Sequence, residues 1–332
     1  MIFQAPILAL LLVSALAALV SLWSAGFGAL VLRRWDVASG ARAQLRLERT
    51  TELVSTLFGF VMLAEIAALL LFVYNADRMA ELFVGAMCAV GTLNVNPYGF
   101  PALYLKIAVF FAAALWLVLD RADRLGRDYP LAKVKYAAML PIAGLLLAAG
   151  AVEITYFLGL ETDVITSCCS KLFTPVNEGL ASEVTGLAPD LALWLLAGAG
   201  VIVAVTGASS LATGRGQGWF ALSGAVMFAV ALAAIVSVIS LYVYDHPNHH
   251  CPFCLLQREY GYYGYVLYLP LFAGTALALG AGVTRSFHRV ESLSGALPAM
   301  TQRLVAAGMV AFGLFGLAVL WAIAGSQLIL FG

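Results

Sequence analysis

Charged residues are scarce in this chain. Only 11% of its 332 residues are Asp, Glu, Lys or Arg, whereas soluble globular domains carry about 25%. Apolar side chains make up 63% and gather in runs of about 20 residues or more, the length that a helix needs to cross a bilayer. Because a backbone in lipid must satisfy its own hydrogen bonds, each run is predicted to be a helix. The sequence therefore predicts an all-α, polytopic membrane protein whose surroundings are a lipid bilayer.

Several motifs of known chemistry are also missing. No Gly-x-x-x-x-Gly-Lys occurs, which excludes nucleotide hydrolysis by a P-loop. No Cys-x-x-Cys-His occurs, which argues against a covalently attached c-type haem. None of the four histidines lies within an apolar run, which excludes a membrane-embedded bis-histidine haem. The formal net charge is zero, so no overall field favours nucleic acid as a partner.

Eight apolar runs are long enough to be membrane spans. They cover approximately residues 6–32, 52–74, 102–119, 136–158, 190–211, 219–244, 255–283 and 304–330. No long repeat or low-complexity tract separates them, so residues 1–332 are interpreted as a single integral membrane domain. The opening Met1-Ile-Phe-Gln lacks the basic region of a cleavable signal peptide, and the first run is long enough to span.

Basic residues alternate between the connectors. All but four of the 18 lysines and arginines lie in residues 33–51, 120–135, 212–218 and 284–303. The positive-inside rule puts these connectors in the cytoplasm, so both termini are predicted to face outward. All the cysteines then lie in loops on the outer side, namely Cys88, Cys168, Cys169, Cys251 and Cys254. Sulfur gathered on one face indicates chemistry or disulfides in a compartment that permits them.

A polar hinge between the sixth and seventh runs concentrates the reactive side chains. Residues 245–258 read Asp-His-Pro-Asn-His-His-Cys-Pro-Phe-Cys-Leu-Leu-Gln-Arg and contain Cys251 and Cys254 as a Cys-x-x-Cys pair. A helical pattern begins directly behind the pair, which predicts that its sulfurs lie at a helix N-terminus, where a thiolate is favoured. Arg258 follows Cys254 by four residues and is predicted to lie one turn below it on the same face.

Two kinds of chemistry remain open for these residues, beside an inert structural role. Thiol–disulfide exchange would use Cys251 and Cys254, with the vicinal Cys168 and Cys169 as a second, easily reduced pair. One cysteine of that vicinal pair could instead bond to Cys88. Binding of a soft metal, such as copper, zinc or mercury, would combine the cysteines with the hinge histidines. The candidate metal ligands are Cys168, Cys169, Cys251, Cys254, His246, His249 and His250.

The run Cys251-Pro-Phe-Cys-Leu-Leu-Gln-Arg258 resembles the Cys-x-x-Cys-x-x-Gln/Glu-Arg signature of DsbB-type disulfide-generating membrane proteins. The resemblance covers only this segment. It implies that Cys251 and Cys254 pass electrons to a membrane quinone, with Gln257 and Arg258 beside that cofactor. It also implies a bacterial inner membrane location with the cysteine loops on the periplasmic side.

The same resemblance implies an outer cysteine pair that exchanges with a thioredoxin-like extracytoplasmic protein. In bacterial vitamin K epoxide reductase relatives the loop pair precedes the Cys-x-x-Cys pair, as Cys168 and Cys169 do here. This chain departs from the pattern in three ways: it has more spans than those folds, its loop cysteines are adjacent, and its hinge carries histidines.

Ionisable residues within the apolar runs are further candidates. Glu65 lies near the middle of the second run, and Lys106 and Glu153 lie nearer the outer ends of theirs. Such groups are costly in lipid and mark a pathway or a buried pair. Glu65 is a candidate for the quinone site and its proton path. Lys106 is expected to extend its ammonium group toward the interface.

The sequence thus favours a dithiol–disulfide oxidoreductase that exchanges electrons between extracytoplasmic thiols and a quinone. Its catalytic residues would be Cys251, Cys254, Cys168, Cys169 and Arg258. The first alternative is a protein that binds or transports a soft metal, with copper or zinc as its ligand. The second is a non-catalytic membrane subunit whose outer loops dock a partner protein.

Overall fold

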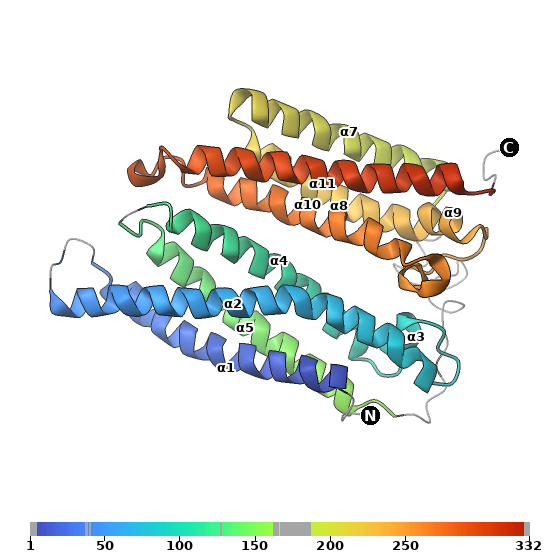
Figure 1. Cartoon of the computed structure of the whole chain (residues 1–332), viewed down its shortest axis with the longest axis horizontal. Helices are drawn as coiled ribbons and strands as arrows, with labels where there is room; N and C mark the ends of the chain where they lie inside the picture. The colour runs from blue at the N-terminus through green and yellow to red at the C-terminus, as the bar shows by residue number, and fades with distance from the viewer. Residues whose placement is uncertain are drawn as a thin grey trace. The chain divides into compact units, whose positions relative to one another are not determined.

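The computed structural model describes residues 5–36, 39, 41–126, 128–161, 166 and 187–328. Eight helical segments within these residues are long and apolar enough to cross a membrane (Figure 1). Large apolar side chains such as Leu19 and Trp321 are exposed along these helices, as lipid-facing side chains are. The prediction of an all-α polytopic membrane protein with eight spans is confirmed. The side that each loop faces, and the identity of the membrane, remain predictions.

The chain groups into two compact units. Unit 1 comprises residues 1–76, 93–162 and 286–297, and unit 2 comprises residues 77–92, 163–285 and 298–332. Each unit has a buried apolar core of its own. The sequence shows no linker between them, and the interpretation of the chain as one membrane domain stays a prediction.

Unit 1 is built on four long helices. These are α1 (Ala5–Arg34), α2 (Arg42–Arg78), α4 (Gly99–Asp123) and α5 (Ala132–Leu158). Helix α5 packs against both α1 and α4. In the core, the rings of Phe58 and Trp116 meet edge to face with their centroids 4.7 Å apart. The buried Tyr136 donates its hydroxyl hydrogen to the carbonyl oxygen of Thr51 at 2.7 Å, so this polar atom is satisfied within lipid-spanning helices.

Unit 2 contains four further spans, one of which is composite. They are α7 (Pro189–Thr213), α8 (Gln217–Ala234) continued by the π-helical turn η2 (Ile235–Ile239) and α9 (Ser240–Tyr244), α10 (Tyr263–Arg285), and α11 (Leu297–Gly325). Helix α8 packs against α7 and α10. A Cβ added at Gly224 of α8 would lie 2.7 Å from the methyl group of Ala278 on α10. Small residues let these two helices approach closely, as they do in other membrane proteins.

Two irregular segments of unit 2 connect long helices: residues 77–92 follow α2, and residues 245–262 join α9 to α10. Residues 77–92 hold the 3₁₀ turn η1 (Met79–Leu82) and most of the short helix α3 (Ala89–Leu93). Residues 245–262 hold the single 3₁₀ turns η3 (Cys254–Leu256) and η4 (Arg258–Tyr260).

The seventh span begins later than the apolar pattern predicted. We expected it to cover residues 255–283, but α10 begins at Tyr263. Gly261 and Tyr262 have φ values of 61° and 57°, a left-handed conformation that no right-handed helix contains. Leu255 and Leu256 are nevertheless buried, because the turn that carries them packs inside unit 2.

Candidate functional site

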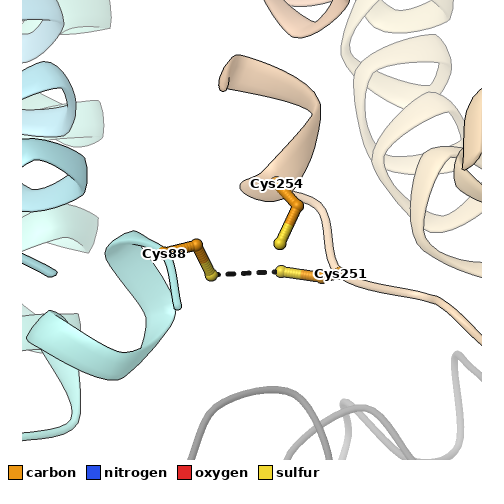
Figure 2. Close-up of side chains that lie close together, drawn as sticks. All are labelled: Cys88, Cys251 and Cys254. Carbon is orange, nitrogen blue, oxygen red and sulfur yellow. Dashed lines mark hydrogen bonds between the residues drawn. The ribbon is translucent and has the colours of Figure 1, made fainter. Parts of the chain in front are cut away.

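Three cysteine side chains converge in unit 2. The Sγ atom of Cys88 lies 3.5 Å from that of Cys251, and the sulfurs of Cys88, Cys251 and Cys254 all lie within 4.8 Å of one another. Figure 2 shows the three side chains pointing toward one another from two separate backbone segments. The exposed fractions of the three residues are 0%, 0% and 4%, so their sulfurs face an interior that water hardly reaches.

Two tyrosines hold the backbone of the Cys-x-x-Cys pair. The hydroxyl of Tyr244 donates a hydrogen bond to the carbonyl oxygen of Cys251, and that of Tyr268 donates to the carbonyl oxygen of Pro252 at 2.8 Å. Tyr244 ends α9 and Tyr268 belongs to α10. The helices on both sides of the hinge therefore fix the position of the pair.

Cys88 is presented by a tight turn just before α3. Its carbonyl oxygen accepts a hydrogen bond from the N–H of Gly91 at 3.0 Å. A Cβ at Gly91 would lie 2.5 Å from the Cβ of Ala86, so only glycine allows this close return of the chain. Gly85 has a φ of 87°, which also favours glycine. These two glycines make the bend that carries Cys88.

Gln257 joins the two cysteine-bearing segments. Its Nε2 atom donates to the carbonyl oxygen of Met87 at 2.8 Å and to Oδ1 of Asp77 at 3.1 Å. Met87 directly precedes Cys88, and Gln257 lies three residues after Cys254. The amide therefore links the segment that carries Cys88 to the segment that carries the Cys-x-x-Cys pair.

The hinge histidines are not members of the sulfur group. In the part of the chain that the structure describes, the compact group of candidate ligand atoms consists of the three cysteines. His246 is exposed. His249 lies against the ring of Tyr244 with centroids 4.2 Å apart, and Nδ1 of His250 donates to the carbonyl oxygen of Val236 in η2 at 3.0 Å. These contacts tie the hinge to the π-helical turn, and a ligand role for the histidines stays a prediction.

The predicted relation between Cys254 and Arg258 is wrong. Cys254 begins the turn η3, but Gln257 is extended, with φ −81° and ψ 159°, and Arg258 begins a separate turn. The two residues share no continuous helix, and Arg258 is exposed. The pair does not lie at the N-terminus of a long helix either, because α10 begins only at Tyr263. A helix dipole therefore does not act on these sulfurs in the way we expected.

The third sulfur comes from an unexpected place. Cys168 and Cys169, the predicted partners of the Cys-x-x-Cys pair, lie outside the described residues. Cys88 contributes the third sulfur, although it was in neither the catalytic nor the metal set. The signals in the sequence were its predicted outer-side loop and the glycines around it. No spacing links it to Cys251, which follows 163 residues later.

Glu65 belongs to unit 1, where it is buried beside Lys106. The Nζ atom of Lys106 lies 3.3 Å from Oε2 of Glu65 and 3.0 Å from Oε2 of Glu153. Lys106 is only 1% exposed, so the expectation that its ammonium group extends to the interface is wrong. Contacts with both glutamate side chains hold it inside instead, and the role of Glu65 at a quinone site stays a prediction.

Three sulfurs at this separation suit two kinds of chemistry. Thiolates bind soft metal ions, and neighbouring thiols exchange disulfide bonds. Beyond this geometry the chain offers no relative to compare: no protein-family model, no curated protein and no solved structure matches it. The resemblance to DsbB-type proteins therefore remains an expectation from residues 251–258. On its structure, the chain is a polytopic helical membrane protein with a buried cluster of three cysteines.

Proposed function

We propose that this membrane protein binds a soft, thiophilic metal ion, copper(I) in the first place, through Cys88, Cys251 and Cys254. The observation that carries the proposal is the convergence of three buried sulfurs within 4.8 Å of one another. Neutral thiols behave as small apolar groups, and nothing in their chemistry requires three of them to point toward the same place. Thiolates, by contrast, repel one another unless a cation lies among them. A metal ion supplies the attraction that such an arrangement calls for.

The number of sulfurs favours copper(I) over zinc. Structural zinc sites take four ligands, whereas thiolates select copper(I), for which fewer and softer ligands suffice. Among the residues that the structure describes, three sulfurs and no imidazole nitrogen belong to the group. A water molecule as fourth ligand is disfavoured, because the three cysteines are at most 4% exposed.

The groups around the sulfurs support a preorganised site. Tyr244, Tyr268 and Gln257 hold the backbone of both cysteine-bearing segments through their side chains. Outer contacts of this kind orient metal ligands and contribute to affinity. Because a thiol must lose its proton before it can bind a metal, the affinity should rise with pH.

The test is the variant Cys88→Ser in the purified full-length protein. Copper(I) is titrated against a competing chelator, with zinc titrated in parallel. We expect one equivalent of copper bound by the unmodified protein. Removal of a residue that only contacts a metal ligand lowers the affinity about 10–100-fold. Cys88→Ser removes a ligand itself, so its copper affinity should fall by more than this.

The double variant Cys168→Ser/Cys169→Ser is the comparison for this experiment. It removes two cysteines and leaves the three converging sulfurs in place, so its copper affinity should equal that of the unmodified protein. Copper binding of unchanged stoichiometry and affinity in Cys88→Ser would contradict the proposal.

A thiol–disulfide oxidoreductase is the second candidate, and the 3.5 Å contact between the sulfurs of Cys88 and Cys251 favours it. A quinone would oxidise the thiols of Cys251 and Cys254 to one disulfide and take up two electrons and two protons to become a quinol. The Cys88 thiol could then attack the Cys251 sulfur, which forms a new disulfide and releases Cys254 as a thiol.

Turnover distinguishes the two candidates. The second one predicts quinone reduction by a reduced thioredoxin-like protein, and loss of that activity in Cys254→Ser and in Cys168→Ser/Cys169→Ser. The metal site predicts no such turnover, together with stoichiometric copper that the double variant retains.

A further inference from the structure

Four side chains from four helices of unit 1 meet in a buried polar cluster. They are Ser14 of α1, Glu65 of α2, Lys106 of α4 and Glu153 of α5, and none is more than 4% exposed. The Nζ atom of Lys106 lies 3.0 Å from Oε2 of Glu153, 3.3 Å from Oε2 of Glu65 and 3.1 Å from Oγ of Ser14. An ammonium group has three N–H donors, so these contacts use its whole capacity.

The charges in this cluster do not balance when every group is ionised. Two carboxylates face one ammonium group, which leaves one net negative charge among lipid-spanning helices. An uncompensated charge that is taken out of water is strongly unfavourable, even after the surrounding protein relaxes. Uptake of one proton by either carboxylate makes the cluster neutral.

The two oxygen atoms of Glu153 differ in their contacts. Its Oε2 atom forms an ion pair with Lys106 and accepts a hydrogen bond from Ser14. Its Oε1 atom is buried and has no hydrogen-bond partner among the described residues. A buried carboxylate oxygen left unpaired is costly, and protonation removes its charge. The groups that act on Glu153 are Lys106, Ser14 and Glu65, one from each of the other three helices.

We propose that Ser14, Glu65, Lys106 and Glu153 form a binding site for a single proton within the membrane-spanning part of unit 1. At neutral pH one of the two carboxyl groups is a carboxylic acid and the other is the counterion of Lys106. Ionisable groups inside membrane helices serve proton relays and coupled transport in many proteins. This site stores one proton that a change of charge nearby can release, and the proposal is independent of the cysteine cluster.

A second ion cluster in the same unit provides an internal comparison. Lys135 Nζ lies 3.0 Å from Oδ1 of Asp120 and 2.6 Å from Oδ2 of Asp123, and Nε of Arg124 lies 2.7 Å from Oδ2 of Asp120. Two carboxylates here face two cations. This cluster is neutral without an added proton, so it should contain no carboxylic acid at neutral pH.

The experiment is infrared spectroscopy of the purified full-length protein at neutral pH, in ordinary and heavy water. A carboxylic acid has a C=O stretching band that carboxylates lack and that shifts in heavy water. We expect the unmodified protein to show this band. In both Glu153→Gln and Glu65→Gln, its intensity should fall by the contribution of one carboxylic acid, because the remaining glutamate is then a carboxylate that balances Lys106. In Lys106→Met the band intensity should rise by the contribution of one carboxylic acid, since neither glutamate then has a counterion.

Asp120→Asn is the matched control, because it changes a carboxylate in the balanced cluster and should leave the band unchanged. If Lys106→Met does not fold, the two glutamine variants decide the matter alone. Two results would overturn the proposal: an unmodified protein without the band, or a band that persists at full intensity in both Glu153→Gln and Glu65→Gln.

Discussion

The two units place their polar chemistry in different kinds of structure. In unit 1, Glu65, Lys106 and Glu153 project from continuous helices and pair inside the bundle. In unit 2, Cys88 and the Cys251–Cys254 pair lie on irregular segments that connect helices. Ionised side chains need fixed partners on every side, which rigid helices provide. Three sulfurs can point toward a single place more easily from irregular segments, whose backbone is not restricted to the side-chain directions of a helix.

The comparison also concerns what each unit tolerates. A thiol is a weak hydrogen-bonding group and can be buried at little cost. A lysine or glutamate is buried only when it is paired. We therefore expect substitution in the charged cluster of unit 1 to act on stability, and substitution around the sulfurs of unit 2 to act on ligand binding with little effect on folding.

The largest effect on stability is expected from Lys106→Met. The variant removes the ammonium group that both Glu65 and Glu153 contact, and breaking such a buried ion pair costs about 3 kcal/mol or more. The free energy of unfolding, measured by denaturant titration in mixed micelles, should fall by that amount.

Lys135→Met is the control for this stability experiment. It also removes a buried lysine, but Arg124 remains paired with Asp120, so the loss should be smaller. An equal or greater loss in Lys135→Met would show that net charge does not decide the difference between the clusters.

A moderate effect on metal affinity, with little effect on stability, is expected from Gln257→Leu. The leucine keeps the volume but cannot donate to Met87 or Asp77, so the two cysteine-bearing segments lose their link. Copper affinity should fall about tenfold, the lower end of the effect of outer-shell partners.

Arg258→Leu sharpens this result, because its side chain is exposed and next to Gln257. If the site binds copper, the affinity should be unchanged in Arg258→Leu. If Arg258 stabilises a quinone instead, quinone reduction should disappear in Arg258→Leu. A greater loss of copper affinity in Arg258→Leu than in Gln257→Leu would contradict the proposal that Gln257, and not Arg258, supports the copper ligands.

The smallest effect is a pH dependence of stability from Asp245, at the end of α9. The hydroxyl of Ser326 and the N–H of Gln327 donate to its Oδ1 atom, and these hydrogen bonds lower the pKa of the carboxyl below its ordinary value of 3.8. The carboxylate thus stabilises the folded state above that value, and the contribution is lost as the pH falls through the lower pKa of the folded protein.

Asp245→Asn removes this titration and retains a side chain that tolerates the left-handed φ of 49°. The difference in thermal midpoint between the unmodified protein and the variant should be constant above the ordinary pKa and shrink below it. A difference that does not change with acidification would exclude the carboxylate as the stabilising species.

Particular residues show how far the sequence could be interpreted. The apolar runs predicted all eight spans, and Cys251 and Cys254 were identified as a pair from their spacing alone. The register behind them was mispredicted, because the apolar Leu255 and Leu256 continue the pattern of the next helix. Gly261 and Tyr262 end that continuity through their backbone conformation, which hydrophobicity does not reveal.

The identity of a lipid-spanning helix depends only on its own residues, since a backbone in a bilayer must form its hydrogen bonds locally. The amino-acid sequence therefore determined the number of spans and the interruptions that carry the cysteines. Packing between distant segments decided the rest: it brought Cys88 to Cys251 and buried Lys106 between Glu65 and Glu153. These contacts depend on which helix faces lie together, and no local pattern of residues encodes that choice.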